Sequence, residues 1–356
     1  MFDLNLPPWL ICSLLYVALV IAFGIFWPYI FQCQLIYSSW YPPGSRTKIA
    51  KPSDFGINYT EEVLTTKDGI KLRCYVITLD DIIEAKQAAT ILYFHAGTGN
   101  MGDRLPLVKV FNQKLGANVV MLSYRGYGFS EGKADEKGLR LDSQTLLDFV
   151  KEHDILQHTN LVAFGHALGG AVAIDLVSRN NSDFAGLILE NTFLSIPKVI
   201  SNIAPWLSYL TLLWHQKWPS ETSIQNIINL PVLFISGAKD ELVPIAHMKK
   251  LYQLCGSRQD RCWVEFATGS HNDTCLVPGY FDAIDDFVKG KILISQHWVH
   301  GGFMLDLLQV ERLDSSSSSL QDTSDLYHRL LQHGPVEEQQ LALEQLYDDE
   351  TLYLTD

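Results

Sequence analysis

The stretch Gly165-His166-Ala167-Leu168-Gly169 has the glycine spacing of a turn that presents a catalytic nucleophile. In such a turn, written G-x-S-x-G, a strand ends at a serine and a helix begins directly after it. Glycines stand on both sides because side chains there would clash with the neighbouring strand and helix. Here Ala167 occupies the position of the nucleophile. The turn therefore has the frame for covalent catalysis without the hydroxyl that performs it.

Two downstream residues could complete a triad of nucleophile, acid and histidine, in the order usual for such a turn. Asp240 follows the apolar run 231–236, and His271 follows the run 263–266. In a triad the carboxylate orients the imidazole, which takes the proton of the nucleophile. Taken singly, Asp240 could cap a helix and His271 could be a surface residue. Taken together, and in this order behind the turn, the two residues favour the catalytic interpretation.

An acyl-transfer site also needs two backbone N–H groups aimed at the charge that develops on the carbonyl oxygen. One is expected from Leu168, the residue after the nucleophile position. The other is expected from the loop 95–100, where Gly97 is the candidate, because glycines in this loop keep side chains away from the site.

Short apolar runs alternate with helical patterns along the middle of the chain. This alternation predicts an α/β fold with a mostly parallel sheet covered on both faces by helices. Helices are expected at 101–115, at 137–152 and directly after Ala167, within one domain that spans residues 61–292. Strands, of which the first two form a hairpin, are expected at 63–66, 72–79, 90–94, 118–123, 161–164, 185–189, 231–236 and 263–266.

An insertion at about residues 195–228 separates two of the expected strands, and its centre is apolar and uncharged. One interpretation is an ordinary core-facing helix. The other is a cap that lines an acyl pocket or touches a lipid bilayer. A pocket of this kind would include His95, Trp206, Leu210 and Trp214.

The N-terminal 40 residues have the pattern of a membrane anchor. No charged residue occurs from Leu4 to Ser45, and the apolar stretch from Trp9 to Trp27 has a tryptophan at each end. About 20 apolar residues match the hydrocarbon core of a bilayer, and tryptophan is typical of its interfaces. We expect a single-pass anchor at 1–40 followed by a linker at 41–60. A cleaved signal peptide is the alternative, but a basic start and a small-residue cleavage site are lacking.

The sequence leaves open which side of the membrane holds the domain. Arg46, Lys48 and Lys51 follow the apolar stretch, and the positive-inside rule then favours the cytosol. Asn58 and Asn180 begin glycosylation sequons, which matter only in a lumen. Both an endomembrane and the plasma membrane fit this pattern.

The formal net charge is −13, and most of it lies in residues 311–356. A basic stripe is lacking, so nucleic acid is not expected as a partner. Residues 293–356 include a serine run and are expected to form an acidic, partly disordered tail, either solvated or docking a protein partner. The six cysteines have neither metal-ligand spacing nor a disulfide framework, and no metal or cofactor is expected.

Four stretches resemble the membrane-anchored α/β-hydrolase domain-containing family and its fungal bud-emergence relatives. They are residues 124–132, 165–173, 190–197 and 269–274. The resemblance covers roughly residues 63–291 and implies the α/β-hydrolase fold. It also implies a serine hydrolase of acyl esters or thioesters, with lipids or acylated proteins as substrates. Against the family pattern, Ala167 replaces the catalytic serine and Ala96 replaces a usual glycine.

The missing serine leaves two hypotheses. In the first, Ala167 is a deliberate replacement in an otherwise active hydrolase. The intact glycines, Asp240 and His271 favour this hypothesis, because Asp240 and His271 have little structural reason to persist. In the second, the chain is a natural pseudohydrolase that binds a ligand or a partner at a membrane. Under both, the chain is expected to be inactive or nearly so, because removing a triad nucleophile costs on the order of 10⁶ in turnover.

Overall fold

The computed structural model describes residues 7–205, 208 and 214–293. Its centre is an eight-stranded sheet with the strand order β1-β2-β4-β3-β5-β6-β7-β8. The strands are β1 Thr60–Thr65, β2 Lys71–Ile77, β3 Ala89–Phe94, β4 Asn118–Ser123, β5 Asn160–His166, β6 Gly186–Glu190, β7 Val232–Gly237 and β8 Arg261–Phe266.

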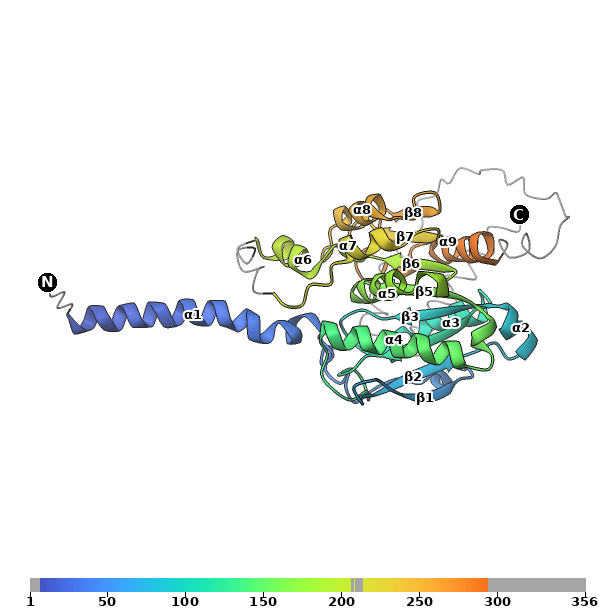
Figure 1. Ribbon diagram of the computed structural model, residues 1–356, viewed down its shortest axis with the longest axis horizontal. Helices are drawn as coiled ribbons and strands as arrows, with labels where there is room; N and C mark the ends of the chain where they lie inside the picture. The colour runs from blue at the N-terminus through green and yellow to red at the C-terminus, as the bar shows by residue number, and fades with distance from the viewer. Residues whose placement is uncertain (1–6, 206–207, 209–213, 294–356) are drawn as a thin grey trace, which may run out of the picture.

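Helices cover both faces of this sheet, while α1 extends away from it (Figure 1). The α-helices are α1 Pro8–Ile36, α2 Ile82–Gln87, α3 Leu105–Gln113, α4 Glu136–Glu152, α5 Leu168–Arg179, α6 Ile196–Ile203, α7 Ser220–Ser223, α8 Ile245–Leu254 and α9 Tyr280–Phe287. Shorter turns of helix are η1 Pro52–Phe55, η2 Met101–Arg104, η3 Leu156–His158, η4 Asn181–Asp183, η6 Ile224–Asn226, η7 Thr274–Leu276 and η8 Val288–Leu293.

The sheet is mostly parallel, as the alternation of apolar runs and helical patterns predicts. Strands β1 and β2 form the expected hairpin, and β2 pairs with β4 antiparallel. The remaining pairs, from β4 to β8, are all parallel. Parallel strands end at the same edge of a sheet, so the loops after β3, β5, β6, β7 and β8 open toward one another.

Alternation along the strands divides the apolar core into two clusters, one on each face. In β3, Leu92 and Phe94 belong to the cluster that includes side chains of α4 and α5. Ile91 and Tyr93 belong to the cluster that includes side chains of α3 and α9. Successive strand residues point to opposite faces, so a strand buried on both faces must be apolar throughout. This explains why these strands read as continuous apolar runs in the sequence.

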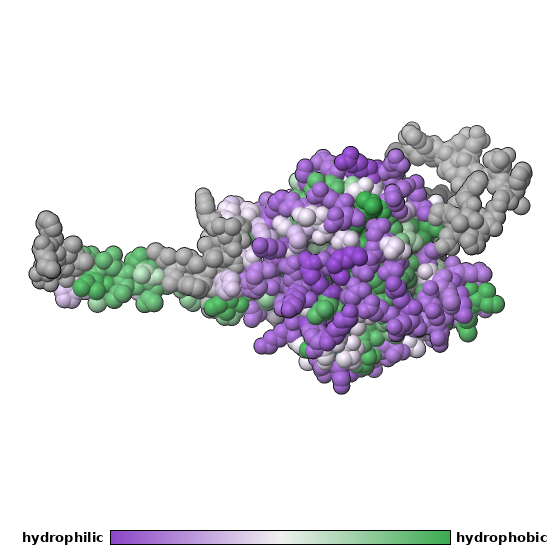
Figure 2. Space-filling view, in the orientation of Figure 1, coloured by the Kyte–Doolittle hydropathy of each residue, from purple (hydrophilic) through white to green (hydrophobic). Residues whose placement is uncertain are grey.

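Helix α1 has 29 residues and projects away from the domain (Figure 1). Most of the part of this helix that Figure 2 colours is hydrophobic. Among the residues that the structure describes, no helix meets the combined length and hydropathy needed to cross a membrane. The C-terminal end of α1 packs against the domain. Gln32 is buried there, and Tyr37, the residue after the helix, is 3% exposed.

Several segments differ from the expectation. The helix expected at 101–115 starts as the turn η2, because the Asn100 side chain accepts from Gly102 N and ends the preceding loop. The segment 41–60, expected as a linker, packs on the domain, where Phe55 and Ile57 are buried. Residues 206–207, 209–213 and 294–356 lie outside the described residues, and so do the predicted pocket residues Trp206 and Leu210 and nearly all of the acidic tail.

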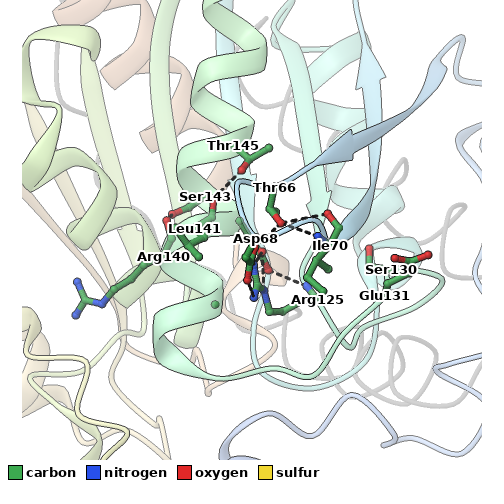
Figure 3. Close-up of polar contacts among 12 residues, drawn as sticks. Thr66, Asp68, Ile70, Arg125, Ser130, Glu131, Arg140, Leu141, Ser143 and Thr145 are labelled. Carbon is green, nitrogen blue, oxygen red and sulfur yellow. Dashed lines mark hydrogen bonds and ion pairs between the residues drawn. The ribbon is translucent and has the colours of Figure 1, made fainter.

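A buried arginine holds the loop after β4 in place (Figure 3). Arg125 donates from its backbone N and from Nε to the carboxylate of Asp142 on α4, at 2.8 Å each. Its two terminal nitrogens donate to Asp68 in the β1–β2 turn, at 2.8 and 3.0 Å. Asp142 is fully buried and Arg125 is 6% exposed. This ion pair therefore joins the hairpin, the loop 124–132 and helix α4.

We expect Arg125→Met to lower the free energy of unfolding by about 3–5 kcal/mol, because it leaves the Asp142 carboxylate buried without its partner. Urea denaturation measures the change. The matched control is Arg73→Met, which breaks a half-exposed pair with Glu61 and should cost about 1 kcal/mol or less. Equal losses in the two variants would contradict the role given to the buried pair.

Candidate active site

The turn between β5 and α5 holds Ala167 in an unusual conformation. Its φ is 51° and its ψ is −113°, in a region that residues with a side chain rarely adopt. The backbone around it is fixed from β6 and the loop beyond. Ala167 N donates to Glu190 O at 3.0 Å, and Thr192 Oγ1 donates to Ala167 O at 2.7 Å. Such strain persists where the surroundings impose it and is typical of functional sites.

The flanking glycines are required by a close approach of backbones. A Cβ on Gly169 would lie 1.9 Å from the carbonyl oxygen of Phe94 in β3. A Cβ on Gly165 would lie 2.3 Å from the carbonyl oxygen of Gly169. The first turn of α5 therefore rests directly on strands β3 and β5. Residue 167 is left at the apex, with 7% of its surface exposed.

Asp240 and His271 meet as the sequence predicts. His271 Nδ1 lies 2.8 Å from Asp240 Oδ2, and their side chains are 8% and 1% exposed. Asp240 follows β7, and its second oxygen accepts from the backbone N–H groups of Leu242 at 2.9 Å and Val243 at 2.7 Å. These bonds fix the carboxylate plane, which in turn orients the imidazole.

The pair lies beside the turn that holds Ala167. His166, the residue before Ala167, donates from Nε2 to His271 O at 2.8 Å. The two imidazole rings are 5.2 Å apart between centroids. The structure therefore brings the nucleophile position, the acid and the histidine to one edge of the sheet.

The two expected oxyanion donors are also neighbours. A Cβ placed on Gly97 would contact the side chain of Leu168 at 3.5 Å. The carbonyl of Gly97 is engaged on the other side, where Tyr127 donates its hydroxyl to Gly97 O at 2.8 Å. Leu168 begins α5, so its N–H is one of the free donors at the start of a helix.

His95 and Trp214, expected to line a pocket, are buried at 1% and 4% exposure. The His95 ring packs against Tyr124 and Tyr127, with centroids 4.2 and 5.1 Å away. Its Nδ1 contacts Ala96 O at 2.8 Å, and within the described residues Nε2 has no hydrogen-bond partner. Burial lowers the pKa of His95 to about 4, so the imidazole is neutral at physiological pH.

The residue that joins the loops of the site was not predicted from the sequence. Asn191 follows β6 with a φ of 44°. Its amide nitrogen donates to Ser270 O, His271 O and Thr274 Oγ1 at 3.0, 3.2 and 3.0 Å, and its oxygen accepts from Gly237 N at 2.8 Å. The signal that could have marked Asn191 is its place directly after a parallel strand, where polar residues meet the site.

Glu190, the last residue of β6, is a second acid next to the site. It is 4% exposed and accepts a hydrogen bond from the Tyr280 hydroxyl at 2.9 Å. Burial raises the pKa of Glu190 to about 7, against the lowering effect of Tyr280 and Arg104. In the described part of the chain, no group of three or more His, Cys, Asp or Glu residues is placed to hold a metal ion.

Comparison with known proteins identifies the family. A family model described as serine aminopeptidase, S33, matches residues 85–227. Protein bem46 of Schizosaccharomyces pombe is 43% identical over 270 residues, which cover 76% of this chain and 89% of the relative. The α/β-hydrolase domain-containing protein WAV2 of Arabidopsis thaliana is 36% identical, over 70% of this chain and 84% of its own. The chain belongs to the Bem46-type α/β-hydrolase family. The family resemblance stated from the motifs is thus confirmed.

Solved structures of an α/β-hydrolase and an esterase share the fold of the Bem46-type chain. An α/β-hydrolase from Vibrio vulnificus superposes with a TM-score of 0.58 at 20% identity, covering 72% of this chain and 92% of its own. The esterase Pf2001 of Pyrococcus furiosus superposes with a TM-score of 0.55 at 18% identity, covering 69% and 96%. The domain therefore has the α/β-hydrolase fold, as expected.

Glu190 makes the stability of the domain depend on pH. The folded pKa, about 7, lies above the ordinary 4.5, so the folded state binds more protons and stability falls as the pH rises between these values. We expect Glu190→Gln to remove this loss. The difference in free energy of unfolding between the Glu190→Gln variant and the unchanged chain should therefore shift in favour of the variant by on the order of 3 kcal/mol from pH 5 to pH 8.

Urea denaturation at the two pH values tests this expectation. Glu241→Gln, at an exposed position, controls for the loss of one negative charge. A Glu190→Gln variant whose advantage stays constant with pH would show that Glu190 is ionised in the folded state throughout this range.

Proposed function

We propose that this chain is the scaffold of a serine hydrolase for acyl esters or thioesters, in which Ala167 stands where the nucleophile acts. The observation that carries the proposal is the pairing of His271 with Asp240, at 2.8 Å, beside a turn that holds residue 167 at a φ of 51°. A strained apex next to an oriented imidazole is the arrangement that activates a serine hydroxyl.

With a serine at position 167, the steps follow from these residues. The serine Oγ attacks the acyl carbonyl carbon, and His271 Nε2 takes the hydroxyl proton while Asp240 holds Nδ1–H. The bond to the leaving alcohol or thiol then breaks, and His271 returns the proton to that group. Water attacks the acyl-enzyme in the same way, releasing the carboxylic acid and restoring the serine. The N–H groups of Leu168 and Gly97 would stabilise the oxyanion in both steps.

The chain as it stands lacks the serine Oγ, which would make the first attack on the substrate. The methyl group of Ala167 can neither attack a carbonyl nor give a proton to His271. The alternative proposal is therefore a pseudohydrolase, which keeps the pocket to bind an acyl ligand or a partner. The two proposals differ in what a restored hydroxyl does, because a binding protein would gain no turnover from it.

We also propose that α1 anchors the domain to a membrane. The stretch from Trp9 to Trp27 is apolar, and the side chains of Leu15 and Leu19 are 59% and 69% exposed. One relative, 41% identical over 74% of this chain, is named as an uncharacterized membrane protein, YNL320W of Saccharomyces cerevisiae. An anchored domain fits a lipid or an acylated protein as the substrate, because both lie at the bilayer surface.

We expect Ala167→Ser to create measurable hydrolysis of p-nitrophenyl esters and covalent labelling by a fluorophosphonate probe. The reason is that the oriented His271 can take the proton of the new hydroxyl. Adding Asp240→Asn to this variant should lower kcat by about 10⁴-fold, because the imidazole loses its orienting partner. Ala267→Ser, which adds a hydroxyl at an exposed position, is the control and should not be labelled.

A folded Ala167→Ser variant that is neither labelled nor active would contradict the hydrolase proposal and favour the binding protein. Labelling of the unchanged chain would contradict the claim that it lacks a nucleophile.

For the anchor, we expect the full chain to remain in the membrane pellet after alkaline carbonate extraction. The variant Leu15→Lys/Leu19→Lys should move to the supernatant, because each lysine near the centre of a span costs about 3 kcal/mol. Val63→Lys, at a half-exposed position of β1, is the matched control and should leave the protein in the pellet. Release of the unchanged chain by carbonate would exclude a spanning anchor.

A further inference from the structure

The segment that follows α1 runs along the loop proposed to bind the oxyanion. The carbonyl oxygen of Ile36, the last residue of α1, would lie 2.8 Å from a Cβ on Gly97. Ser38 and Thr98 form a parallel β-bridge. Gly99 N then donates to Tyr41 O at 2.8 Å. Residues 36–41 therefore pack along one side of the loop 95–100.

Two tyrosines hold the other side of this loop. Tyr127 donates its hydroxyl to Gly97 O, and Tyr124 donates to His95 O at 3.1 Å. Both belong to the segment 124–132 that Arg125 fixes to α4 and to the β1–β2 turn. That side is thus anchored to the body of the domain, and the remaining freedom of the loop depends on how firmly the segment after α1 is fixed.

Tyr37 fixes that segment. Its hydroxyl donates to Gln216 Oε1 at 2.6 Å and accepts from Trp218 Nε1 at 2.9 Å. All three residues are buried, at exposures of 3%, 4% and 1%. Tyr37 lies between Ile36 and Ser38, both of which contact the loop, so a shift of Tyr37 displaces these contacts directly.

Gln216 and Trp218, which Tyr37 contacts, lie near the end of the 195–228 insertion, called the cap below, and are themselves tied to two helices. On α1, Gln32 Oε1 accepts from His215 N at 2.9 Å and from Gln216 N at 3.0 Å. On α4, Glu136 N donates to Gln216 Oε1 at 2.6 Å, and the Glu136 carboxylate accepts from Trp218 N at 3.0 Å. The end of α1, the returning cap segment and the start of α4 thus form one buried polar junction.

We propose that Tyr37 is a positioning residue, which locks the segment after α1 to the cap and thereby sets the place of the Gly97 loop. Helix α1 is then part of the site and not only a tether, since a movement of its last turn reaches the loop through Ile36 and Ser38. The catalytic consequence rests on the proposed function, while the coupling between Tyr37 and the loop does not.

Hydrogen–deuterium exchange of the full chain with Ala167 in place tests the coupling without requiring activity. In Tyr37→Phe, peptides covering 95–104 should exchange about fivefold faster or more, while peptides of β7 keep their rate. Gln32→Leu, which removes the acceptor of His215 N and Gln216 N on α1, should have the same local effect. Tyr16→Phe, at a 70% exposed position of α1, is the matched control and should change neither.

A second measurement uses the Ala167→Ser background. Adding Tyr37→Phe should lower kcat on a p-nitrophenyl ester by about tenfold while KM stays within about twofold, because a displaced N–H donor weakens transition-state binding. An inactive Ala167→Ser parent would contradict the proposed function, and the exchange rates alone would then decide the role of Tyr37. Unchanged exchange at 95–104 in Tyr37→Phe, or an equal rise over the whole domain, would overturn the positioning role.

Discussion

The site depends on how closely the first turn of α5 approaches strands β3 and β5. At Gly169 and Gly165 the backbones leave no room for a Cβ, so the chain must turn within one residue. That residue is Ala167, whose positive φ is a consequence of the approach and not of its own preference. The strain, about 1–3 kcal/mol for such a conformation, is held by hydrogen bonds from Thr192 and to Glu190. The same approach exposes the first N–H groups of α5 beside the loop at Gly97, where a negative oxygen is stabilised most.

The other loops of the site are held in place by single buried polar side chains. Asn191 connects the loops after β7 and β8, which carry Asp240 and His271. Arg125 fixes the tyrosines behind the Gly97 loop, and Tyr37 fixes the segment in front of it. Each of these side chains is buried and makes several hydrogen bonds, so each joins elements that lie far apart in the sequence. Buried polar groups that are fully paired specify one arrangement, and the site uses three of them.

Local patterns explain what the sequence could predict. Strands buried on both faces are continuous apolar runs, and a strand-to-helix turn needs glycines at fixed spacing, so the sheet, Ala167, Asp240 and His271 could be placed from the sequence. Long-range contacts explain what it could not. Tyr37 meets Gln216 across 179 residues, and no periodic pattern marks either residue. The burial of His95 was not predicted for a similar reason, because it depends on two tyrosines about 30 residues away. The packing of 41–60 depends on Phe55 and Ile57 within a segment whose prolines and glycine suggested a linker.

The structure gives Asp240, His271 and residue 167 different value as evidence for a lost serine hydroxyl. From the sequence, Asp240 and His271 have little reason to persist without a nucleophile. In the structure Asp240 has a structural role, since its side chain accepts from two backbone N–H groups, whereas the contacts of His271 with His166 and Asn191 use only its backbone carbonyl. The presence of Asp240 therefore argues less strongly for a recent loss of serine than the sequence suggested, while that of His271 keeps its weight. Residue 167 is different, because its strained φ gives no structural benefit that an alanine can use. A turn that imposes this strain on a methyl group, beside an imidazole that Asp240 orients, supports the proposal that a hydroxyl belongs at position 167.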